Sequence, residues 1–367
     1  MAGNTILNKL IYDFFRKYEV PEIKDNYDLG SPSRFIVIRQ HNQLGDLLAC
    51  VPLFRAIKEK YPHAHITAIT SPSNYRGLLK NKYIDRLFIF DKKKLLNPGY
   101  FNSLHKLLSE KYDVAIVPVT ISISFTSNIL ARFANAKIRI GPRSLDGKEN
   151  KSAFFFDRRI TIDWRKFPDQ NMYERSLDLV KPFGITTSNL KPGISFDEED
   201  IKVADEFISA SVNLNKGEYL IGLHISAGKP QNRWSLNKFA SLISRLDNSY
   251  KCKIYITGWI SDQEEISFMK ANLKTPVSYF LNHTITQTAA LISKSDLFIS
   301  NDTGIMHVAA STDVPQISLF GHTNPFLWAP GGTDKRFIRK SDFIDDITVE
   351  DVFEDCEILL RKIPAYH

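Results

Sequence analysis

The amino-acid sequence predicts an α/β fold made of two domains, each a parallel β-sheet flanked by helices. Short runs rich in β-branched residues alternate along the chain with segments whose apolar residues recur at helical spacing. Proline, glycine and an acidic cluster at residues 197–200 interrupt this alternation between residues 181 and 215. With 367 residues, the chain is long enough for two domains that each have a core.

The strands are expected in two groups, one on each side of the interruption. The ranges that read as strands are 35–38, 65–69, 86–90, 114–117, 219–224, 253–257, 297–300 and 316–320. These ranges divide the chain into an N-terminal amphipathic helical segment at 1–30, a first Rossmann-like domain at 31–185, a linker at 186–215, a second Rossmann-like domain at 216–345 and a C-terminal helix at 346–367.

The N-terminal segment has an apolar helical face bordered by basic residues. The face comprises Ile6, Leu10, Ile11, Phe14, Phe15 and Tyr18, and the basic residues are Lys9, Arg16 and Lys17. Such a helix can lie on an anionic membrane or pack against the body of the protein. We expect packing, and contact with a membrane stays open.

Composition is that of an ordinary globular protein with a net charge of +7. This charge suits acidic partners such as a nucleotide sugar or a phosphorylated lipid, whereas nucleic acid is disfavoured because Lys and Arg are spread along the chain. The three cysteines, Cys50, Cys252 and Cys356, suggest neither a disulfide framework nor a zinc site. No apolar run reaches the ~20 residues of a membrane span and no secretory signal is present, so we expect a cytoplasmic protein, with the inner face of the cytoplasmic membrane left open.

The segment 296–310 reads as a buried strand, a sharp polar turn and a helix. The helix start offers unpaired backbone N–H groups and a positive dipole end, which suit an anion. Asp302 or Thr303 can cap this helix, Gly304 lets a ligand approach the main chain, and His307 lies about one turn further on. The same residues also fit an ordinary turn and cap, with His307 as a structural residue.

A second strand, loop and helix cover residues 35–58. The loop is polar and contains Gly45, and Asp46 stands where the loop meets the helix. The helix is indicated by the apolar residues Leu47, Leu48, Val51, Phe54 and Ile57. Taken alone, Asp46 fits a helix cap as well as a functional carboxylate.

Two further segments complete a recognisable set. One is the strand, Gly-containing loop and basic-Trp segment at 222–235 with Phe239 and Ala240, and the other is Phe320-Gly321-His322-Thr323-Asn324-Pro325 followed by Trp328 and Pro330. Taken in their order along the chain (35–58, 222–235, 296–310 and 320–330), the four segments resemble glycosyltransferase family 9, the lipopolysaccharide heptosyltransferase family. They span residues 34 to 330, which leaves only the two ends uncovered. The resemblance implies the GT-B fold, in which two Rossmann-like domains face a cleft, the first binding the acceptor and the second the nucleotide sugar.

The resemblance implies that Asp46 is the catalytic base. The loop before it is one residue longer than is usual in the family, so His41 is kept as a reserve base. Lys229 and Arg233 are expected to hold the donor diphosphate together with Asp302, Thr303, Gly304 and His307, and Asn232 stands where the family usually has a lysine. No Asp-X-Asp motif lies in a suitable loop, so we expect neither a metal nor a cofactor, and the leaving charge must be met by N–H groups and cations.

The nucleotide end is expected after the strand at 253–257. Gly258 forms the turn, and Glu264 fits the family position for a carboxylate that accepts bonds from ribose hydroxyls. Asp262 is expected to cap the following helix. Trp259 can stack on the base or cover the core, and both readings stay open.

The expected function is an inverting, metal-independent transfer of a sugar, heptose from ADP-heptose, to a lipopolysaccharide core or a related glycolipid acceptor. One alternative is a sugar-nucleotide epimerase, which would act without an acceptor. Another is a non-catalytic sugar-nucleotide or glycan-binding protein on the same scaffold. An NAD-dependent dehydrogenase is disfavoured, because no Gly-X-Gly-X-X-Gly follows a predicted strand.

Overall fold

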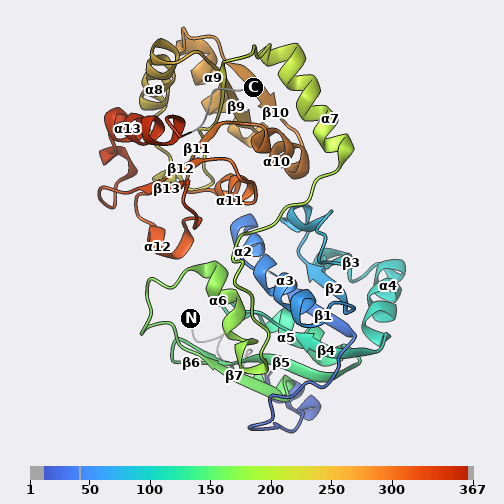
Figure 1. Cartoon of the computed structure of the whole chain (residues 1–367). Coiled ribbons are helices and arrows are strands. Elements are labelled where there is room, and N and C mark those ends of the chain that lie inside the picture. The colour runs from blue at the N-terminus through green and yellow to red at the C-terminus, as the bar shows by residue number, and fades with distance from the viewer. Residues whose placement is uncertain (1–11, 41–42, 363–367) are drawn as a thin grey trace. The chain divides into compact units, whose positions relative to one another are not determined.

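The computed structural model describes residues 12–40 and 43–362. The chain divides into two compact units, Met1–Leu190 and Lys191–His367 (Figure 1). The division lies within the range 186–215 that was expected to be a linker. Each unit is a parallel or mainly parallel sheet flanked by helices, so the expected α/β fold class is confirmed.

The sheet of the first unit has the strand order β3-β2-β1-β4-β5-β6, with β7 paired to β5. Its strands are β1 (Arg34–Arg39), β2 (His65–Thr70), β3 (Arg86–Ile89), β4 (Tyr112–Ile116), β5 (Ala136–Leu145), β6 (Lys148–Glu149) and β7 (Arg158–Ile162). All pairs are parallel except β5 with β6. The central strand β1 is an unbroken apolar run at residues 35–38 because it is buried on both faces.

The helices of the first unit are α2 (Leu44–Leu48), α3 (Val51–Lys60), α4 (Pro98–Ser109), α5 (Phe125–Phe133) and α6 (Met172–Asp178). The single helix expected after the first strand is therefore two helices. Pro52 lies in the first turn of α3, where a missing N–H costs no helical hydrogen bond.

Only part of the expected N-terminal helical segment lies within the described residues. Residues 1–11 lie outside the described residues, residues 12–15 are helical, a 3₁₀ turn follows at Arg16–Tyr18, and residues 19–30 form no helix. Phe15 packs edge-to-face against Phe125 and Phe155, with ring centroids 5.9 and 6.1 Å apart. The described part of the segment thus packs against the first unit, and Phe14 remains 58% exposed.

The sheet of the second unit has the order β10-β9-β8-β11-β12-β13 and is parallel throughout. Its strands are β8 (Tyr219–His224), β9 (Cys252–Gly258), β10 (Ser278–Leu281), β11 (Leu297–Asn301), β12 (Gln316–Leu319) and β13 (Lys335–Ile338). The helices are α7 (Glu198–Phe207), α8 (Leu236–Ser249), α9 (Gln263–Asn272), α10 (Ile285–Ser293), α11 (Gly304–Ala310), α12 (Pro325–Trp328) and α13 (Val349–Leu360). Helix α13 lies in the range 346–367 expected for a C-terminal helix.

Helix α7 lies inside the range expected to be a linker. The acidic cluster that suggested a break starts this helix, because the Asp197 carboxylate accepts from the Asp200 N–H and the Asp200 carboxylate accepts from the Asp197 N–H, both at 3.2 Å. Asp200 also accepts from the Thr286 hydroxyl of α10 at 2.9 Å. Charge at this place therefore stabilises a helix start and anchors α7 to the second unit.

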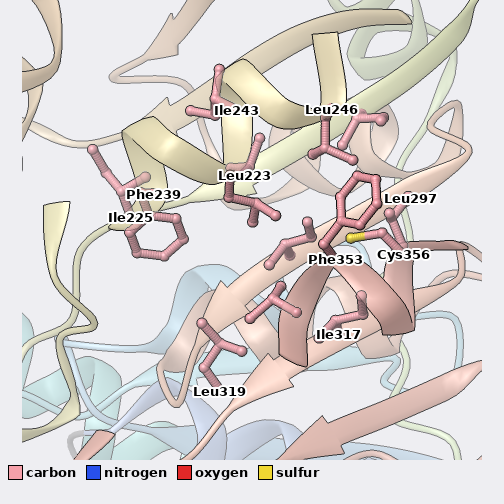
Figure 2. Close-up of a cluster of buried hydrophobic side chains, with 14 of the residues drawn as sticks. Leu223, Ile225, Phe239, Ile243, Leu246, Leu297, Ile317, Leu319, Phe353 and Cys356 are labelled. Atoms are coloured by element: carbon pink, nitrogen blue, oxygen red, sulfur yellow. The ribbon is translucent and has the colours of Figure 1, made fainter. Parts of the chain in front are cut away.

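The core of the second unit lies between its sheet and helices α8 and α13 (Figure 2). It contains Leu223, Ile225, Phe239, Ile243, Leu246, Leu297, Ile317, Leu319, Phe353 and Cys356. Trp234 belongs to the same core: its ring lies edge-to-face on Phe239 at 4.8 Å and its indole N–H donates to the Ile347 carbonyl at 2.9 Å. This anchor holds one end of the loop that follows β8.

No described helix has the length and apolar character that a membrane crossing needs.

Candidate functional site

Asn301, the last residue of β11, ties three segments of the second unit together. Its buried side-chain amide donates to the carbonyls of Ile225 and Ser226 at 3.1 and 3.4 Å, and its side-chain oxygen accepts from the Trp234 N–H at 3.2 Å. The loop after β8 is thereby fixed against the turn after β11. Asn301 was not predicted as a site residue, because its only signal in the sequence is a polar residue at the end of a buried strand.

Asp302 is the point on which neighbouring loops converge. The Asn232 side-chain amide donates to the Asp302 carboxylate at 2.8 Å and to its carbonyl at 3.2 Å. Burial raises the pKa of the Asp302 carboxyl, against the opposing effects of the Thr323 side chain, the Lys229 charge and the Asn232 amide. Lys229 and Thr323 come from the loops after β8 and β12, so three loops meet at this carboxylate.

The start of α11 differs from the expected cap. Thr303 occupies the N-cap position, but its side chain makes no capping hydrogen bond, and the Asp302 carboxylate is bonded to Asn232. The prediction that one of these side chains caps the helix receives no support from the hydrogen bonds found. Helix α11 has only seven residues, which limits its dipole.

His307 is buried in α11 and 4% exposed. Burial lowers the pKa of its imidazole to about 4, so the ring is neutral at pH 7. The ring lies edge-on to Trp328, with centroids 6.0 Å apart. His307 therefore carries no positive charge at pH 7.

A pocket of about 350 Å³ in the second unit brings two of the expected residues together. Its lining comprises Ile225, Arg233, Trp234, Leu236, Glu264, Glu265 and Phe268. Arg233 is held by Glu265, 2.8 Å from its Nη1, and by the Ala227 carbonyl, 2.7 Å from its Nε. Glu265 is 6% exposed, whereas Glu264 is exposed and has no such partner among the described ion pairs. Lys229 is exposed on the neighbouring part of the loop and does not line this pocket.

The turn at the end of β9, where nucleotide binding is expected, has a packing role in the structure. A Cβ at Gly258 would lie 3.0 Å from Leu281 and 3.2 Å from Ile266, so glycine is favoured by packing alone. The Trp259 N–H donates to the Asp262 carboxylate at 2.8 Å, which closes the turn before α9. Trp259 is 42% exposed, and its ring is therefore accessible for stacking.

Asp46 is placed differently from the expected loop tip. It lies within α2 and is 1% exposed. The Thr120 hydroxyl, which follows β4, lies 3.4 Å from Asp46 Oδ1, and Arg39 Nη2 lies 3.4 Å from the Asp46 carbonyl. His41, the reserve base, lies outside the described residues.

The chemistry of the two units differs in kind. The second unit has a pocket lined by Glu264 and Glu265. Outside this pocket it has the exposed Lys229 and the turn at the start of α11. The first unit holds a buried carboxylate beside a buried guanidinium. Within the described residues, no group of three or more His, Cys, Asp or Glu side chains is arranged to hold a metal ion.

Comparison with known proteins gives a consistent picture. A model of glycosyltransferase family 9 (heptosyltransferase) matches residues 101–350, which include Asp302 and the loop after β8 but not Asp46. The chain is 26% identical to lipopolysaccharide heptosyltransferase 3 of Escherichia coli over 329 residues, covering 88% of this chain and 93% of that protein.

Two solved structures are similar in fold. A glycosyl transferase of family 9 from Veillonella parvula matches with a TM-score of 0.78 and 23% identity, covering 92% of this chain and all of that one. The E. coli ADP-heptose lipopolysaccharide heptosyltransferase II matches with a TM-score of 0.73 and 22% identity, covering 89% and 98%. The two-unit architecture is thus that of the GT-B heptosyltransferases.

Proposed function

Because the chain belongs to glycosyltransferase family 9, the heptosyltransferase family, we propose that it transfers heptose from ADP-heptose to a lipopolysaccharide core acceptor. The E. coli relative is named a lipopolysaccharide heptosyltransferase, and the name of one similar structure includes ADP-heptose. The observation that carries the proposal is the convergence of Lys229, Asn232 and Thr323 on Asp302 in the second unit.

In this proposal, the second unit binds the donor diphosphate. A diphosphate leaves with negative charge growing on its oxygen, which N–H groups and cations can stabilise without a metal. The Thr303 and Gly304 N–H groups and the exposed Lys229 supply this stabilisation, while Asp302 and its amide bond to Asn232 hold the turn. His307 adds a neutral hydrogen-bonding group, since the pKa of its imidazole is about 4.

The pocket beside Arg233 is assigned to the nucleoside. Its volume of about 350 Å³ falls in the range of small-molecule sites. Glu264 accepts hydrogen bonds from the ribose hydroxyls, and Gly258 provides the turn beside it. Arg233 is neutralised by Glu265, so its role is to shape the pocket and to direct its free N–H groups towards the phosphates.

The first unit supplies the acceptor side of the reaction. The acceptor hydroxyl oxygen attacks C1 of the heptose, its proton passes to the Asp46 carboxylate, and the bond from C1 to the diphosphate breaks, which releases ADP. A one-step displacement of this kind inverts the anomeric centre. His41 remains the reserve base.

A lipid-linked acceptor would bring the protein to the inner face of the cytoplasmic membrane. Phe14 supports this localisation, because it is 58% exposed and the Lys17 ammonium lies 4.0 Å from its ring centroid. An exposed aromatic ring beside a cation suits an anionic lipid surface.

The first experiment is a thermal-shift panel of ADP, GDP, UDP and CDP with wild type and Asp302→Ala. A ligand at 100 times its dissociation constant stabilises by about 2.7 kcal/mol. We expect ADP alone to stabilise wild type and the variant to lose the response. Stabilisation by a different nucleotide would overturn the ADP-heptose donor.

A transfer assay separates the alternatives. With ADP-heptose and a heptose-deficient, deacylated lipopolysaccharide core, wild type should release ADP only when the acceptor is present. Conversion of the donor without acceptor would favour an epimerase. Asp46→Asn should bind ADP like wild type and lose transfer, whereas a non-catalytic protein would show no transfer to lose.

A further inference from the structure

Arg39 is a buried cation at the carboxyl end of β1 and is 1% exposed. Its Nη2 donates to the Thr120 hydroxyl and, at 3.4 Å, to the Asp46 carbonyl. Thr120 is equally buried, and its Oγ1 lies 3.4 Å from Asp46 Oδ1. Because β1 and β4 are adjacent parallel strands, residues 81 positions apart meet at one edge of the sheet.

The Arg39 guanidinium is under-satisfied for a buried cation. Its Nε and Nη1 are buried and have no hydrogen-bond partner in the part of the chain that the structure describes. The Cys50 thiol lies beside Arg39 and Asp46, but sulfur is a weak acceptor. Burying a cation without full hydrogen bonding destabilises a fold, and an apolar side chain would serve a buried strand end better. Packing therefore does not explain arginine here.

The hydrogen bonds run from Arg39 to the Thr120 hydroxyl and from that hydroxyl to the Asp46 carboxylate. A threonine hydroxyl has one proton, and when its oxygen accepts from Arg39 that proton is free to point to Asp46. The hydroxyl thus orients one carboxylate oxygen. Burial alone disfavours a charged carboxylate, and a nearby guanidinium favours it. Thr120 thus affects the orientation of the Asp46 carboxylate, and Arg39 affects its charge.

We propose that Arg39 and Thr120 are positioning residues for Asp46: Thr120 fixes the orientation of its carboxylate, and Arg39 stabilises the carboxylate's negative charge. This inference rests on the proposed function, in which Asp46 accepts the proton of the acceptor hydroxyl. Neither residue contacts the substrate in this scheme. Their loss should therefore slow the proton-transfer step and leave donor binding intact.

The test compares Thr120→Val with Thr120→Ser in the transfer assay with ADP-heptose and deacylated core. Valine keeps the shape and removes the hydroxyl, so we expect kcat to fall roughly 10- to 100-fold, with KM for ADP-heptose unchanged. Serine keeps the hydroxyl and should recover most of that loss. Thr67→Val is the matched control: Thr67 is a buried threonine of β2, and its replacement should leave kcat unchanged.

Three results would overturn the inference, two of them in kcat and one in KM. One is a Thr120→Val enzyme with the kcat of wild type, and another is a Thr120→Ser enzyme as slow as the valine variant. A rise in KM at constant kcat would assign Thr120 to binding and would also contradict it.

Arg39 is tested by Arg39→Lys and Arg39→Met. Lysine keeps the charge, so the kcat of Arg39→Lys should be at least about tenfold higher than that of Arg39→Met. Thermal denaturation of both variants checks that they are folded. If Arg39→Met does not fold, the Thr120 pair still decides. Asp46→Asn distinguishes failure of the proposed function from failure of this inference. Full transfer by Asp46→Asn would show that Asp46 is not the base. An inactive Asp46→Asn together with an unaffected Thr120→Val would contradict only the positioning role.

Discussion

The Asn232 side-chain amide donates to the Asp302 carboxylate at 2.8 Å, which joins the loop after β8 to the turn after β11. Asn232 stands where resemblance to the family leads one to expect a lysine. An amide can bond the carboxylate and remain buried without adding a charge, and Asn232 is 6% exposed. The departure from the family pattern is thus a local structural solution, and Lys229 remains as the exposed cation of the loop.

Asn232→Ala should weaken donor binding. Losing a hydrogen bond to a charged group costs about 1.5–3 kcal/mol, which corresponds to a roughly 10- to 150-fold rise in the dissociation constant of ADP if the full cost appears in binding. Isothermal titration with ADP measures it. Gln231→Ala, an exposed neighbour in the same loop, is the control and should bind like wild type. Unchanged ADP binding by Asn232→Ala would separate this contact from the donor site.

Replacing Glu264 should affect ADP binding, whereas replacing Glu265 should affect the stability of the fold. Glu264 is exposed in the pocket, so Glu264→Gln should weaken ADP binding about tenfold while the melting temperature stays constant. Glu265 is buried against Arg233, so Glu265→Gln should lower the free energy of unfolding by about 1–2 kcal/mol, or about 2–6 °C in melting temperature. Calorimetry with and without ADP measures both effects. The reverse pattern would assign the ribose contact to Glu265.

Much of the fold could be predicted, because a strand buried on both faces needs an unbroken apolar run, as residues 35–38 of β1 have. The strand β5 escaped prediction because Gly141, Pro142 and the two arginines Arg139 and Arg143 break its pattern. Helix α7 escaped because the acidic residues that cap it also resemble a linker.

The candidate site was predicted unevenly. Motif residues such as Asp302 stand in recognisable local patterns. Asn301, Glu265, Arg39 and Thr120 carry no local pattern, since their importance comes from partners up to 81 residues away. Such residues become visible only when adjacent strands bring their loops together.

His307 should make stability depend on pH. Burial lowers the pKa of its imidazole to about 4 in the folded protein, against about 6.5 in the unfolded chain. The unfolded state therefore binds the proton first, and stability present above pH 6.5 is lost as the pH falls towards 4. Between pH 7 and pH 5, this group alone should remove about 2 kcal/mol.

Urea unfolding at these two pH values measures the effect in wild type and His307→Gln. The variant should lose less stability on acidification, by about the same 2 kcal/mol. His63→Gln is the control, because His63 is exposed, and its pH dependence should match that of wild type. An unchanged slope in His307→Gln would show that the imidazole is not held neutral by burial.

Phe14 and Phe15 should have opposite roles although they are neighbours. Phe15 packs on Phe125 and Phe155, so Phe15→Ala should lower the free energy of unfolding by about 2 kcal/mol. Phe14 is exposed beside Lys17, so Phe14→Ala should leave stability unchanged and reduce binding to vesicles of phosphatidylglycerol and phosphatidylethanolamine about fivefold. Vesicle sedimentation and thermal denaturation of both variants measure this. Equal vesicle binding by wild type and Phe14→Ala would remove Phe14 as a membrane contact, and the remaining interpretation would be a segment that only packs.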